Sequence, residues 1–420
     1  MLENNISLQK NEMKRNLFKQ LISHLENKEF TIVTGARQTG KSTLLKQLEV
    51  HAKGLKYPAV FLNLENKSVL SYLNESPLNI LSYLPTSEKR IIVLIDEIQY
   101  LHDPSNFLKL LYDEYVDKIK IVATGSSAFY IDDKFKDSLA GRKKIFNLLT
   151  CSFDEYLRLN NRDELITELI RIQSNPNAKS MHLDILRQEW ETYMIYGGYP
   201  AVITESNKKE KIARLAEIRD SFTRRDVMES GVQNQTAFYN LFRILASQSG
   251  NLLNTNELSK SLRIKHETVS HYLETLQKCF HIALIRPYYR NISKELTKMP
   301  KSYLLDTGLL CCLTNNFQPL HLRSDKGMLW ENSFFRVLCD KYGINEINFW
   351  RTTNENEVDF VIPNLDVPQA IEAKFNERLI NENKYKKFKE NYPDIPLSFA
   401  YYEPFDEDFF RRIYYIANGE

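Results

Sequence analysis

One eight-residue motif near the N-terminus constrains the fold more than any other feature of the sequence. Residues 35–42 read Gly-Ala-Arg-Gln-Thr-Gly-Lys-Ser, which fits the phosphate-loop pattern G-x-x-x-x-G-K-[S/T]. A β-branched run (30–34) precedes the motif and a helical pattern (42–50) follows it, as such a loop requires. A chance glycine turn is the alternative, but the fixed positions should coincide by accident in only about one chain in a hundred. The motif therefore predicts a P-loop between a strand and a helix.

Each fixed position of this loop has a chemical task. The glycines let the backbone wrap around phosphates, and N–H groups at the helix N-terminus donate to the anion. Lys41 reaches the β- and γ-phosphate oxygens, and Ser42 offers a hydroxyl to Mg²⁺. No Asn-Lys-x-Asp string supports guanine recognition, so we expect ATP with Mg²⁺. The expected nucleotide contacts are Gly35, Ala36, Arg37, Gln38, Thr39, Gly40, Lys41, Ser42 and Thr43.

Two acidic residues end the most apolar run of the chain. Residues 91–95 are Ile-Ile-Val-Leu-Ile, and Asp96 and Glu97 follow. At the carboxyl end of a parallel strand, Asp96 is placed to hold the water shell of Mg²⁺ and Glu97 to polarise an attacking water. An acidic turn after a buried strand is the alternative. The position behind a P-loop, with one more strand (59–64) between, favours ATP hydrolysis.

Three further side chains are candidates for contact with the γ-phosphate. A strand expected at 119–124 ends in Thr124, and either Thr124 or Ser126 is placed to orient the water. Arg142 follows Leu-Ala-Gly and carries a guanidinium that can stabilise γ-phosphate charge, either in its own subunit or across an oligomer interface. An ordinary surface arginine beside two lysines is the alternative for Arg142.

The patterns change along the chain and suggest four segments. In residues 1–150, short β-branched runs alternate with helical patterns, which is typical of an α/β fold with a parallel sheet and crossover helices. Residues 151–235 are polar and helical, and we interpret them as a lid or connector. Residues 236–320 contain short amphipathic pieces and a strand, and residues 321–420 return to mixed helix and strand.

Several of these stretches together resemble a known family. GARQTGKSTLL, LIDEIQYL, ATGSSAF, LAGR and GGYP are similar to segments of prokaryotic AAA+ (STAND-like, archaeal-type) ATPases. The resemblance runs from about Lys14 to Tyr402. It implies an AAA+-like P-loop NTPase core, a helical lid, a winged helix at 236–320 and a restriction-endonuclease-like α/β domain at 321–420. It also implies ATP binding and a homo-oligomer.

The expected winged helix carries a local basic charge. Residues 254–262 and 266–276 predict two short helices around a tight turn, followed by a strand and wing. Residues 251–301 hold nine Lys or Arg against four Glu, whereas the whole chain has a net charge of only +2. We expect DNA phosphate contacts from Lys260, Arg263, Lys265 and Arg290. No Arg or Asn cluster for reading bases is present on the second helix, so sequence specificity should be low. A protein-contact module is the alternative.

The last hundred residues contain a set of acids with nuclease-like spacing. Asp359 lies thirteen residues before Glu372-x-Lys374, which resembles the PD-(D/E)xK signature. There Asp359, Glu372 and Glu331 would bind Mg²⁺ or Mn²⁺, and Lys374 would position or activate water. One alternative is a hairpin with solvent-side salt bridges. Another is a nuclease fold that has lost its catalysis.

The composition excludes several classes of protein. Of the 420 residues 43% are hydrophobic and 26% charged, with only 13 Gly and 14 Pro, which excludes collagen-like and largely disordered chains. No apolar run approaches the length of a membrane span, and no secretory signal pattern is present. The five cysteines lack C-x-x-C spacing, so we expect buried, reduced thiols and a cytoplasmic location.

The leading functional hypothesis is a Mg²⁺-dependent ATPase that binds DNA through the winged helix. ATP binding and hydrolysis would be coupled to DNA processing or remodelling, with metal-dependent nuclease activity left open. The alternative is an ATP-gated regulatory switch whose C-terminal half contacts protein or DNA without cleavage. A nucleotide or metabolite kinase is disfavoured, because Asp96 and Glu97 are suited to activating water.

Overall fold

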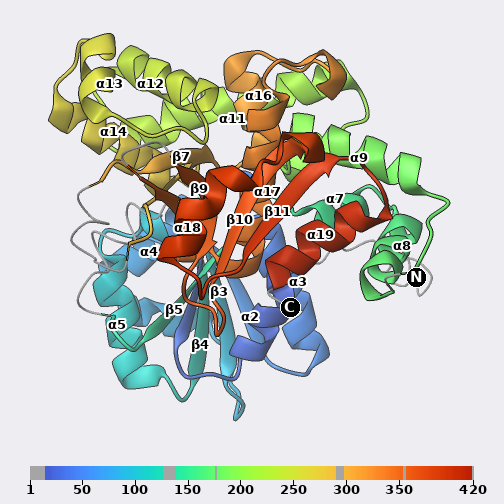
Figure 1. Ribbon diagram of the computed structural model, residues 1–420. Coiled ribbons are helices and arrows are strands. Elements are labelled where there is room, and N and C mark those ends of the chain that lie inside the picture. Colours follow the sequence, from blue (N-terminus) through green and yellow to red (C-terminus); the bar gives the residue numbers. More distant parts are fainter. Residues whose placement is uncertain (1–14, 126–138, 176, 290–297, 353–355, 419–420) are drawn as a thin grey trace. The chain divides into compact units, whose positions relative to one another are not determined.

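A computed structural model describes residues 15–125, 139–175, 177–289, 298–352 and 356–418 (Figure 1). They form two compact units. The first comprises Met1–Leu149 with Lys278–Phe280, and the second comprises Thr150–Gln277 with His281–Glu420. The finer division of the second unit near residues 235 and 320 stays a prediction. Within the described ranges, no helix combines the length and the hydropathy that crossing a membrane requires.

The first unit is built on a five-stranded sheet in which every pair of neighbours is parallel (Figure 1). The strands are β1 (Phe30–Thr34), β2 (Ala59–Asn63), β3 (Ile91–Asp96), β4 (Ile119–Gly125) and β5 (Lys143–Asn147), in the order β2-β3-β4-β1-β5. The expected parallel sheet is confirmed, and four of its strands lie where the patterns predicted them. The edge strand β5 was not predicted, because its sequence, Lys-Lys-Ile-Phe-Asn, buries only Phe146.

Helices cover both faces of this sheet, because alternate residues of each strand point to opposite sides. The elements are α2 (Leu17–His24), α3 (Lys41–Gly54), α4 (Lys67–Glu75), η1 (Pro77–Tyr83), η2 (Ile98–Tyr100) and α5 (Pro104–Tyr115). Ile32 and Val93 pack in one hydrophobic cluster with Leu108 of α5. Val33 and Leu94 pack in another cluster with residues of α2 and α3. Two buried clusters on one sheet hold the P-loop strand in a fixed position.

The second unit begins with helices: α7 (Phe153–Leu159), α8 (Asp163–Ser174), α9 (Leu183–Tyr196), α10 (Pro200–Ile203) and α11 (Lys208–Glu229). The Gly-Gly-Tyr-Pro segment lies between α9 and α10. A Cβ atom on Gly198 would lie 2.3 Å from the carbonyl oxygen of Cys151, and the Gly198 N–H donates to Asp306 at 2.8 Å. The glycine is therefore needed because two backbone segments approach closely. None of the five cysteines, all of which lie in the described residues, forms a disulfide, and all five are buried, as expected.

Three helices and a hairpin follow. They are α12 (Gln235–Ser247), α13 (Thr255–Leu262), α14 (His266–Lys278), β6 (Ile282–Ile285) and β7 (Lys301–Leu304), with β6 and β7 antiparallel. Arg263 ends α13 in a left-handed conformation, with φ of 54°, which turns the chain sharply into α14. The helices α16 (Thr307–Thr314) and η3 (Leu320–Leu322) lead on to the C-terminal part.

A second sheet, of mixed direction, forms the C-terminal part. Its elements are α17 (Lys326–Tyr342), η4 (Ile344–Glu346), β8 (Asn348–Arg351), β9 (Glu357–Ile362), β10 (Gln369–Asn376), η5 (Glu377–Leu379), η6 (Glu382–Tyr385), α18 (Lys386–Asn391), β11 (Leu397–Glu403) and α19 (Glu407–Asn418). The strand order is β11-β10-β9-β8, with β10 and β11 parallel and the other pairs antiparallel. Helix α17 packs on β9 through stacked rings of Phe335 and Phe360, whose centroids are 6.0 Å apart.

Candidate functional site

The P-loop connects the end of β1 to the start of α3 and depends on its two glycines. A Cβ atom on Gly35 would lie 2.1 Å from the carbonyl oxygen of Leu148, and Gly40 has a φ of 93°. Gln38 is also left-handed, at 63°. Side chains other than glycine rarely adopt this conformation, so the loop stores some backbone strain. Strain of this kind is common where a backbone is shaped around a ligand.

The ammonium group of Lys41 lies inside the curve of this loop. It donates to the carbonyl oxygens of Gly35 at 2.8 Å and Ala36 at 2.7 Å, and the residue is buried. These partners are neutral, so phosphate oxygens can replace them with a gain in electrostatic energy. The loop and the first turn of α3 therefore present a cation and backbone donors to an anion, as the sequence predicted.

Arg15 binds the backbone of the loop, and this role was not predicted from the sequence. Its guanidinium donates to the carbonyl oxygen of Thr39 at 2.6 Å and to that of Leu149 at 2.8 Å, and it is buried. Because Arg15 precedes the first strand by many residues, no spacing rule connects it with the motif.

The two acids after β3 are held differently. Asp96 is buried and accepts a hydrogen bond from the Thr124 hydroxyl at 2.5 Å. The Glu97 N–H donates to the same hydroxyl oxygen at 3.2 Å, and Glu97 is left-handed, with φ of 60°. The Gln99 side chain donates to the Glu97 carboxylate. Thr124 thus links Asp96 to the backbone of Glu97, and Gln99, also missed from the sequence, orients the Glu97 carboxylate.

The remaining candidates for γ-phosphate contact have different outcomes. Thr124 lies opposite Val33 on the strand between β3 and the P-loop strand, so it is centrally placed. Ser126 lies outside the described residues. Arg142 directly precedes β5, whose first residue pairs with Phe30, so Arg142 lies at the opposite end of the sheet from the loop. The prediction that Arg142 contacts the phosphate in its own subunit is therefore wrong.

Arg142 instead pairs with Asp113, with Nε 2.7 Å from Oδ1. This ion pair favours the alternative of an ordinary surface arginine, and a contact across an oligomer interface stays a prediction. The other residues of the site fit Mg²⁺ with ATP. Ser42 and Asp96 supply oxygen ligands of the kind that Mg²⁺ prefers, beside a cationic loop suited to phosphates.

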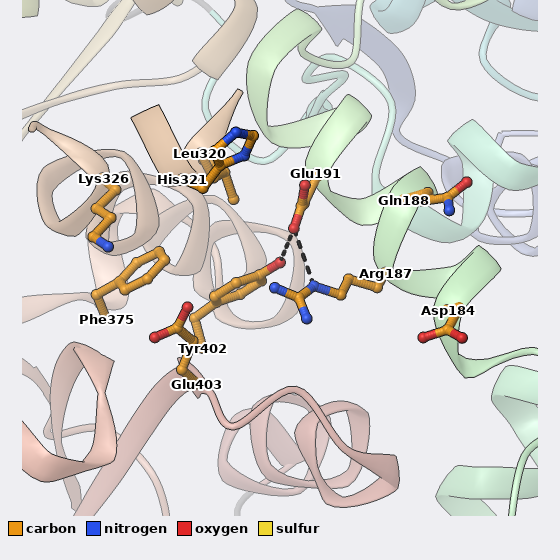
Figure 2. A pocket seen from close by; sticks show the side chains of 10 residues that line it. All are labelled: Asp184, Arg187, Gln188, Glu191, Leu320, His321, Lys326, Phe375, Tyr402 and Glu403. Atoms are coloured by element: carbon orange, nitrogen blue, oxygen red, sulfur yellow. Dashed lines mark hydrogen bonds and ion pairs between the residues drawn. The ribbon is translucent and has the colours of Figure 1, made fainter. Parts of the chain in front are cut away.

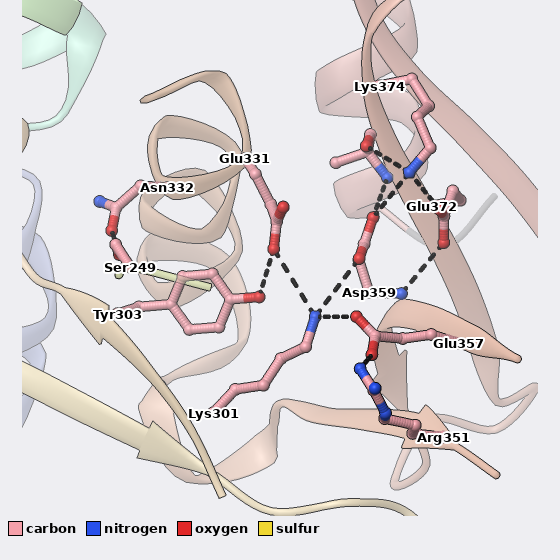
Figure 3. Close-up of polar contacts among 11 residues, drawn as sticks. Ser249, Lys301, Tyr303, Glu331, Asn332, Arg351, Glu357, Asp359, Glu372 and Lys374 are labelled. Atoms are coloured by element: carbon pink, nitrogen blue, oxygen red, sulfur yellow. Dashed lines mark hydrogen bonds and ion pairs between the residues drawn. The ribbon is translucent and has the colours of Figure 1, made fainter. Parts of the chain in front are cut away.

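The four nuclease-like residues of the C-terminal part come together (Figure 3). Glu331 lies on α17, Asp359 on β9, and Glu372 and Lys374 on β10. The Lys374 ammonium contacts the Glu372 carboxylate and lies 3.6 Å from Asp359 Oδ2. The same Oδ2 accepts from the Ala373 N–H at 3.0 Å. The predicted hairpin therefore exists, but its carboxylates are buried, so the alternative with solvent-side salt bridges is wrong.

A second ammonium group, not predicted for this place, lies among the same carboxylates. Lys301 of β7 is 2% exposed, and its Nζ lies 2.5 Å from Glu357 Oε1, 3.4 Å from Asp359 Oδ1 and 3.8 Å from Glu331 Oε1 (Figure 3). Lys301 was counted among the basic residues of the expected DNA-binding segment, and its burial corrects that assignment. Its spacing from Asp359 follows no motif, so only the fold reveals the contact.

Burial and charge act together on these groups. Burial opposes the charge of Lys301, but the carboxylates of Glu331, Asp359 and Glu357 outweigh that effect and raise its pKa. Burial raises the pKa of Glu331 and of Glu372, and the Asp359 charge raises both further. The two lysines partly offset these shifts. Burial and the Asp359 charge therefore favour the neutral forms of Glu331 and Glu372, while Lys301 and Lys374 stabilise the ionised carboxylates beside them.

The expected metal ligands do not fit this arrangement. In the part of the chain that the structure describes, no three or more Asp, Glu, His or Cys side chains are grouped to hold a metal ion. Glu331, Asp359 and Glu372 each face a neighbouring cation or donor instead. The prediction of Mg²⁺ or Mn²⁺ ligands at these three residues is therefore corrected.

The basic helix pair matches its sequence pattern in part. Lys260, Arg263 and Lys265 are exposed around the turn between α13 and α14. On α14, Val269 and Leu273 are buried, so one face of this helix packs into the core. Arg290, the fourth proposed phosphate contact, is outside the described residues.

A cavity of about 450 Å³ in the second unit was not foreseen (Figure 2). The Arg187 guanidinium and the Tyr402 hydroxyl both donate to Glu191, at 3.1 and 2.7 Å. Asp184 and Glu403 also line the cavity. The three acidic side chains outnumber the two cations of the lining, Arg187 and Lys326, so the cavity does not favour a phosphate group.

Three regions of the chain match known protein families, and the P-loop lies in the first of them. Residues 27–157 match a family described as an AAA domain. Residues 187–320 and 326–404 match two families described as domains of unknown function, DUF8612 and DUF4143. An uncharacterized protein of Haemophilus influenzae is 25% identical over 96% of this chain and 97% of its own length. One of Mycobacterium tuberculosis is 26% identical over 82% of this chain and 69% of its own length.

Among solved structures, DnaA from Aquifex aeolicus bound to AMPPCP is 17% identical over 63% of this chain and 88% of that chain. Its TM-score is 0.28, so the likeness supports no argument about function. Along the chain, a region that matches an AAA domain family is followed by two regions that match families of unknown function.

Proposed function

We propose that this chain hydrolyses ATP at Lys41, Asp96 and Glu97, and that ATP binding controls its contact with DNA. The observation that carries the first part is the Thr124 hydroxyl, which bonds the buried Asp96 carboxylate and the Glu97 backbone at once. This link fixes a metal-binding acid and a water-polarising acid at one edge of the sheet that also carries the P-loop.

The DNA contact is proposed at the α13–α14 pair. Three helices followed by an antiparallel hairpin have the element order of a winged helix, and Lys260, Arg263 and Lys265 supply exposed charge around the turn. Cations in this position suit contacts with DNA phosphates. Such contacts do not read the bases, so DNA of many different sequences should bind with similar affinity. We propose low sequence specificity and a homo-oligomer as the working form.

ATP turnover, measured with and without single-stranded, duplex and branched DNA, tests both parts. Lys41→Ala should abolish nucleotide binding, because it removes the cation that faces the phosphates. The triple variant Lys260→Glu, Arg263→Glu, Lys265→Glu should leave basal turnover intact and lose DNA binding. It should also flatten the dependence of log affinity on log salt by roughly 0.9 per lost phosphate contact. Unchanged DNA affinity in the folded triple variant would favour a protein-contact role.

The burial of Lys301 favours a second candidate, an ATP-gated switch whose C-terminal half binds without cutting. The element order α17, β8, β9, β10, α18, β11, together with the placement of Asp359, Glu372 and Lys374, supports a PD-(D/E)xK-like fold for this half. The charge balance among its carboxylates does not support a metal-dependent reaction. Incubation of the protein with linear, nicked and branched DNA in Mn²⁺, with and without ATP, separates the two candidates.

A further inference from the structure

The carboxylates of the C-terminal part need nearby positive charge, which either a metal ion or protein side chains can supply. Glu331, Glu357, Asp359 and Glu372 lie close together, and each is buried or largely buried. Like charges at contact distance resist joint ionisation unless cations lie between them. A nuclease centre meets this requirement with a divalent metal ion.

Side chains of this chain already meet the requirement. Asp359 is shared between two ammonium groups, with Oδ1 3.4 Å from Lys301 and Oδ2 3.6 Å from Lys374. Glu357 lies between Lys301 and Arg351, whose nitrogens are each 2.5 Å from one of its oxygens. The oxygens that a metal ion would use are therefore occupied by cationic groups from β7, β8 and β10.

Lys301 is held in this position by its backbone. Its strand β7 pairs with β6, with Lys301 opposite Ile285, and forms a further bridge to Leu252. On the other side, the Asn332 amide of α17 bonds both the N–H and the carbonyl of Leu304, at 3.0 and 2.9 Å. Withdrawing the Lys301 side chain would leave a buried ammonium without its carboxylates, and moving the strand would break these bonds.

Glu331 is tied to the same hairpin by a second contact. The Tyr303 hydroxyl donates to Glu331 Oε1 at 2.6 Å, and the Tyr303 ring stacks on Phe335 with centroids 4.4 Å apart. Lys301 and Tyr303 point to the same side of β7, so alternate residues of one short strand both bind the carboxylate centre.

We propose that the ammonium group of Lys301 permanently takes the place that a divalent cation holds in a nuclease centre. The C-terminal domain then does not cleave DNA, and its carboxylates instead fix the β6–β7 hairpin on α17 and β9. This inference stands apart from the proposed ATP hydrolysis and DNA binding, because it concerns neither the P-loop nor the α13–α14 turn.

The test uses the full chain without nucleotide, in an Asp96→Asn background that removes the metal-binding acid of the P-loop site. Mn²⁺ binding is measured by electron paramagnetic resonance, and thermal unfolding is followed in EDTA and in millimolar Mn²⁺. Lys301→Met keeps the length of the side chain and removes its charge, and Lys298→Met, at an exposed lysine three residues away, is the matched control.

We expect no Mn²⁺ binding at this centre, and no Mn²⁺-dependent shift in Tm, in the parent and in Lys298→Met. Lys301→Met should melt at a lower temperature in EDTA, bind one Mn²⁺ and recover part of its Tm. A further Asp359→Asn change should abolish that binding. If Lys301→Met binds no more Mn²⁺ than the parent, the two cations are not interchangeable and the proposal fails.

The parent protein gives a second arm that does not depend on the folding of Lys301→Met. Mn²⁺ bound by the parent and lost in Asp359→Asn would overturn the proposal, as would DNA cleavage by the parent that Asp359→Asn removes. No cleavage and no binding in the parent support it. Because no ATP is present, failure of the proposed ATPase activity would leave these results unchanged.

Discussion

The two polar centres of the molecule each contain a buried lysine, but the partners of the two ammonium groups differ. Lys41 bonds neutral carbonyl oxygens of its own loop, whereas Lys301 lies among the carboxylates of Glu331, Glu357 and Asp359. A phosphate improves the surroundings of the first lysine, while the second already has its counterions. The comparison indicates one centre that is ready for an anionic ligand and one whose charges are already satisfied.

The largest effect is expected from Lys301→Met on stability. Removing one partner of a buried ion pair leaves uncompensated charge and typically costs about 3–5 kcal/mol. Urea denaturation should show this loss, whereas Lys298→Met, on the exposed segment before β7, should change the free energy of unfolding by less than about 0.5 kcal/mol. If the two substitutions lowered the free energy of unfolding equally, Lys301 would not be held by its carboxylates and the contrast between the two centres would be wrong.

A change of similar size, but in rate, is expected at the first centre. Glu97→Gln keeps the shape of the side chain and loses its ability to polarise water, so kcat should fall roughly 100-fold with ATP binding retained. Stability should not change. Glu65→Gln, an exposed acid after β2, is the control and should hydrolyse ATP at the parent rate. Wild-type turnover in Glu97→Gln would assign the water to another residue.

His281, a buried histidine outside both centres, shows how burial without a charged partner changes a pKa. Burial lowers the pKa of His281 to about 3, from an ordinary value of 6.5. The unfolded chain therefore binds a proton between these pH values that the folded chain does not. The contribution of His281 to the free energy of unfolding should fall by about 1.4 kcal/mol for each pH unit below 6.5, and His281→Leu should reduce the measured slope by that amount. An unchanged slope in His281→Leu would show that another group titrates.

The smallest effect is expected from Gln99→Met. This substitution removes the donor to the Glu97 carboxylate and nearly keeps the volume, so kcat should fall about tenfold with an unchanged KM. Single-turnover kinetics would separate this change from an effect on nucleotide binding. A rise in KM alone would mean that Gln99 acts on binding rather than on the orientation of Glu97.

The comparison also explains what could be predicted from the sequence. The P-loop, the acids after β3 and four strands of the first sheet follow from short patterns, because each depends on neighbours in the chain. Asp359, Glu372 and Lys374 were found in the same way, since strand spacing brings them together. Lys301 could not be found, because the contact joins β7 to α17 and β9 through tertiary packing. Its charge suggested DNA instead.

The same reason applies to the other residues that were missed or misplaced. Arg15 reaches the P-loop from outside the motif. Arg142 was assigned to the phosphate because nothing in its local sequence reveals that strand β5 begins at the next residue and carries Arg142 to the other end of the sheet. An edge strand with one buried side chain gives little periodicity, so its direction and its neighbours are determined only in the folded sheet.

The most direct test of the difference between the two centres is the number of Mn²⁺ ions bound by the wild-type chain. Electron paramagnetic resonance titrations would be made without nucleotide and with a saturating ATP analogue that is not hydrolysed. With Ser42 and Asp96 as ligands beside the phosphates and Lys301 in the C-terminal centre, we predict one Mn²⁺ per chain with the analogue and none without it. A nucleotide-independent Mn²⁺ that Asp359→Asn removes would contradict the account.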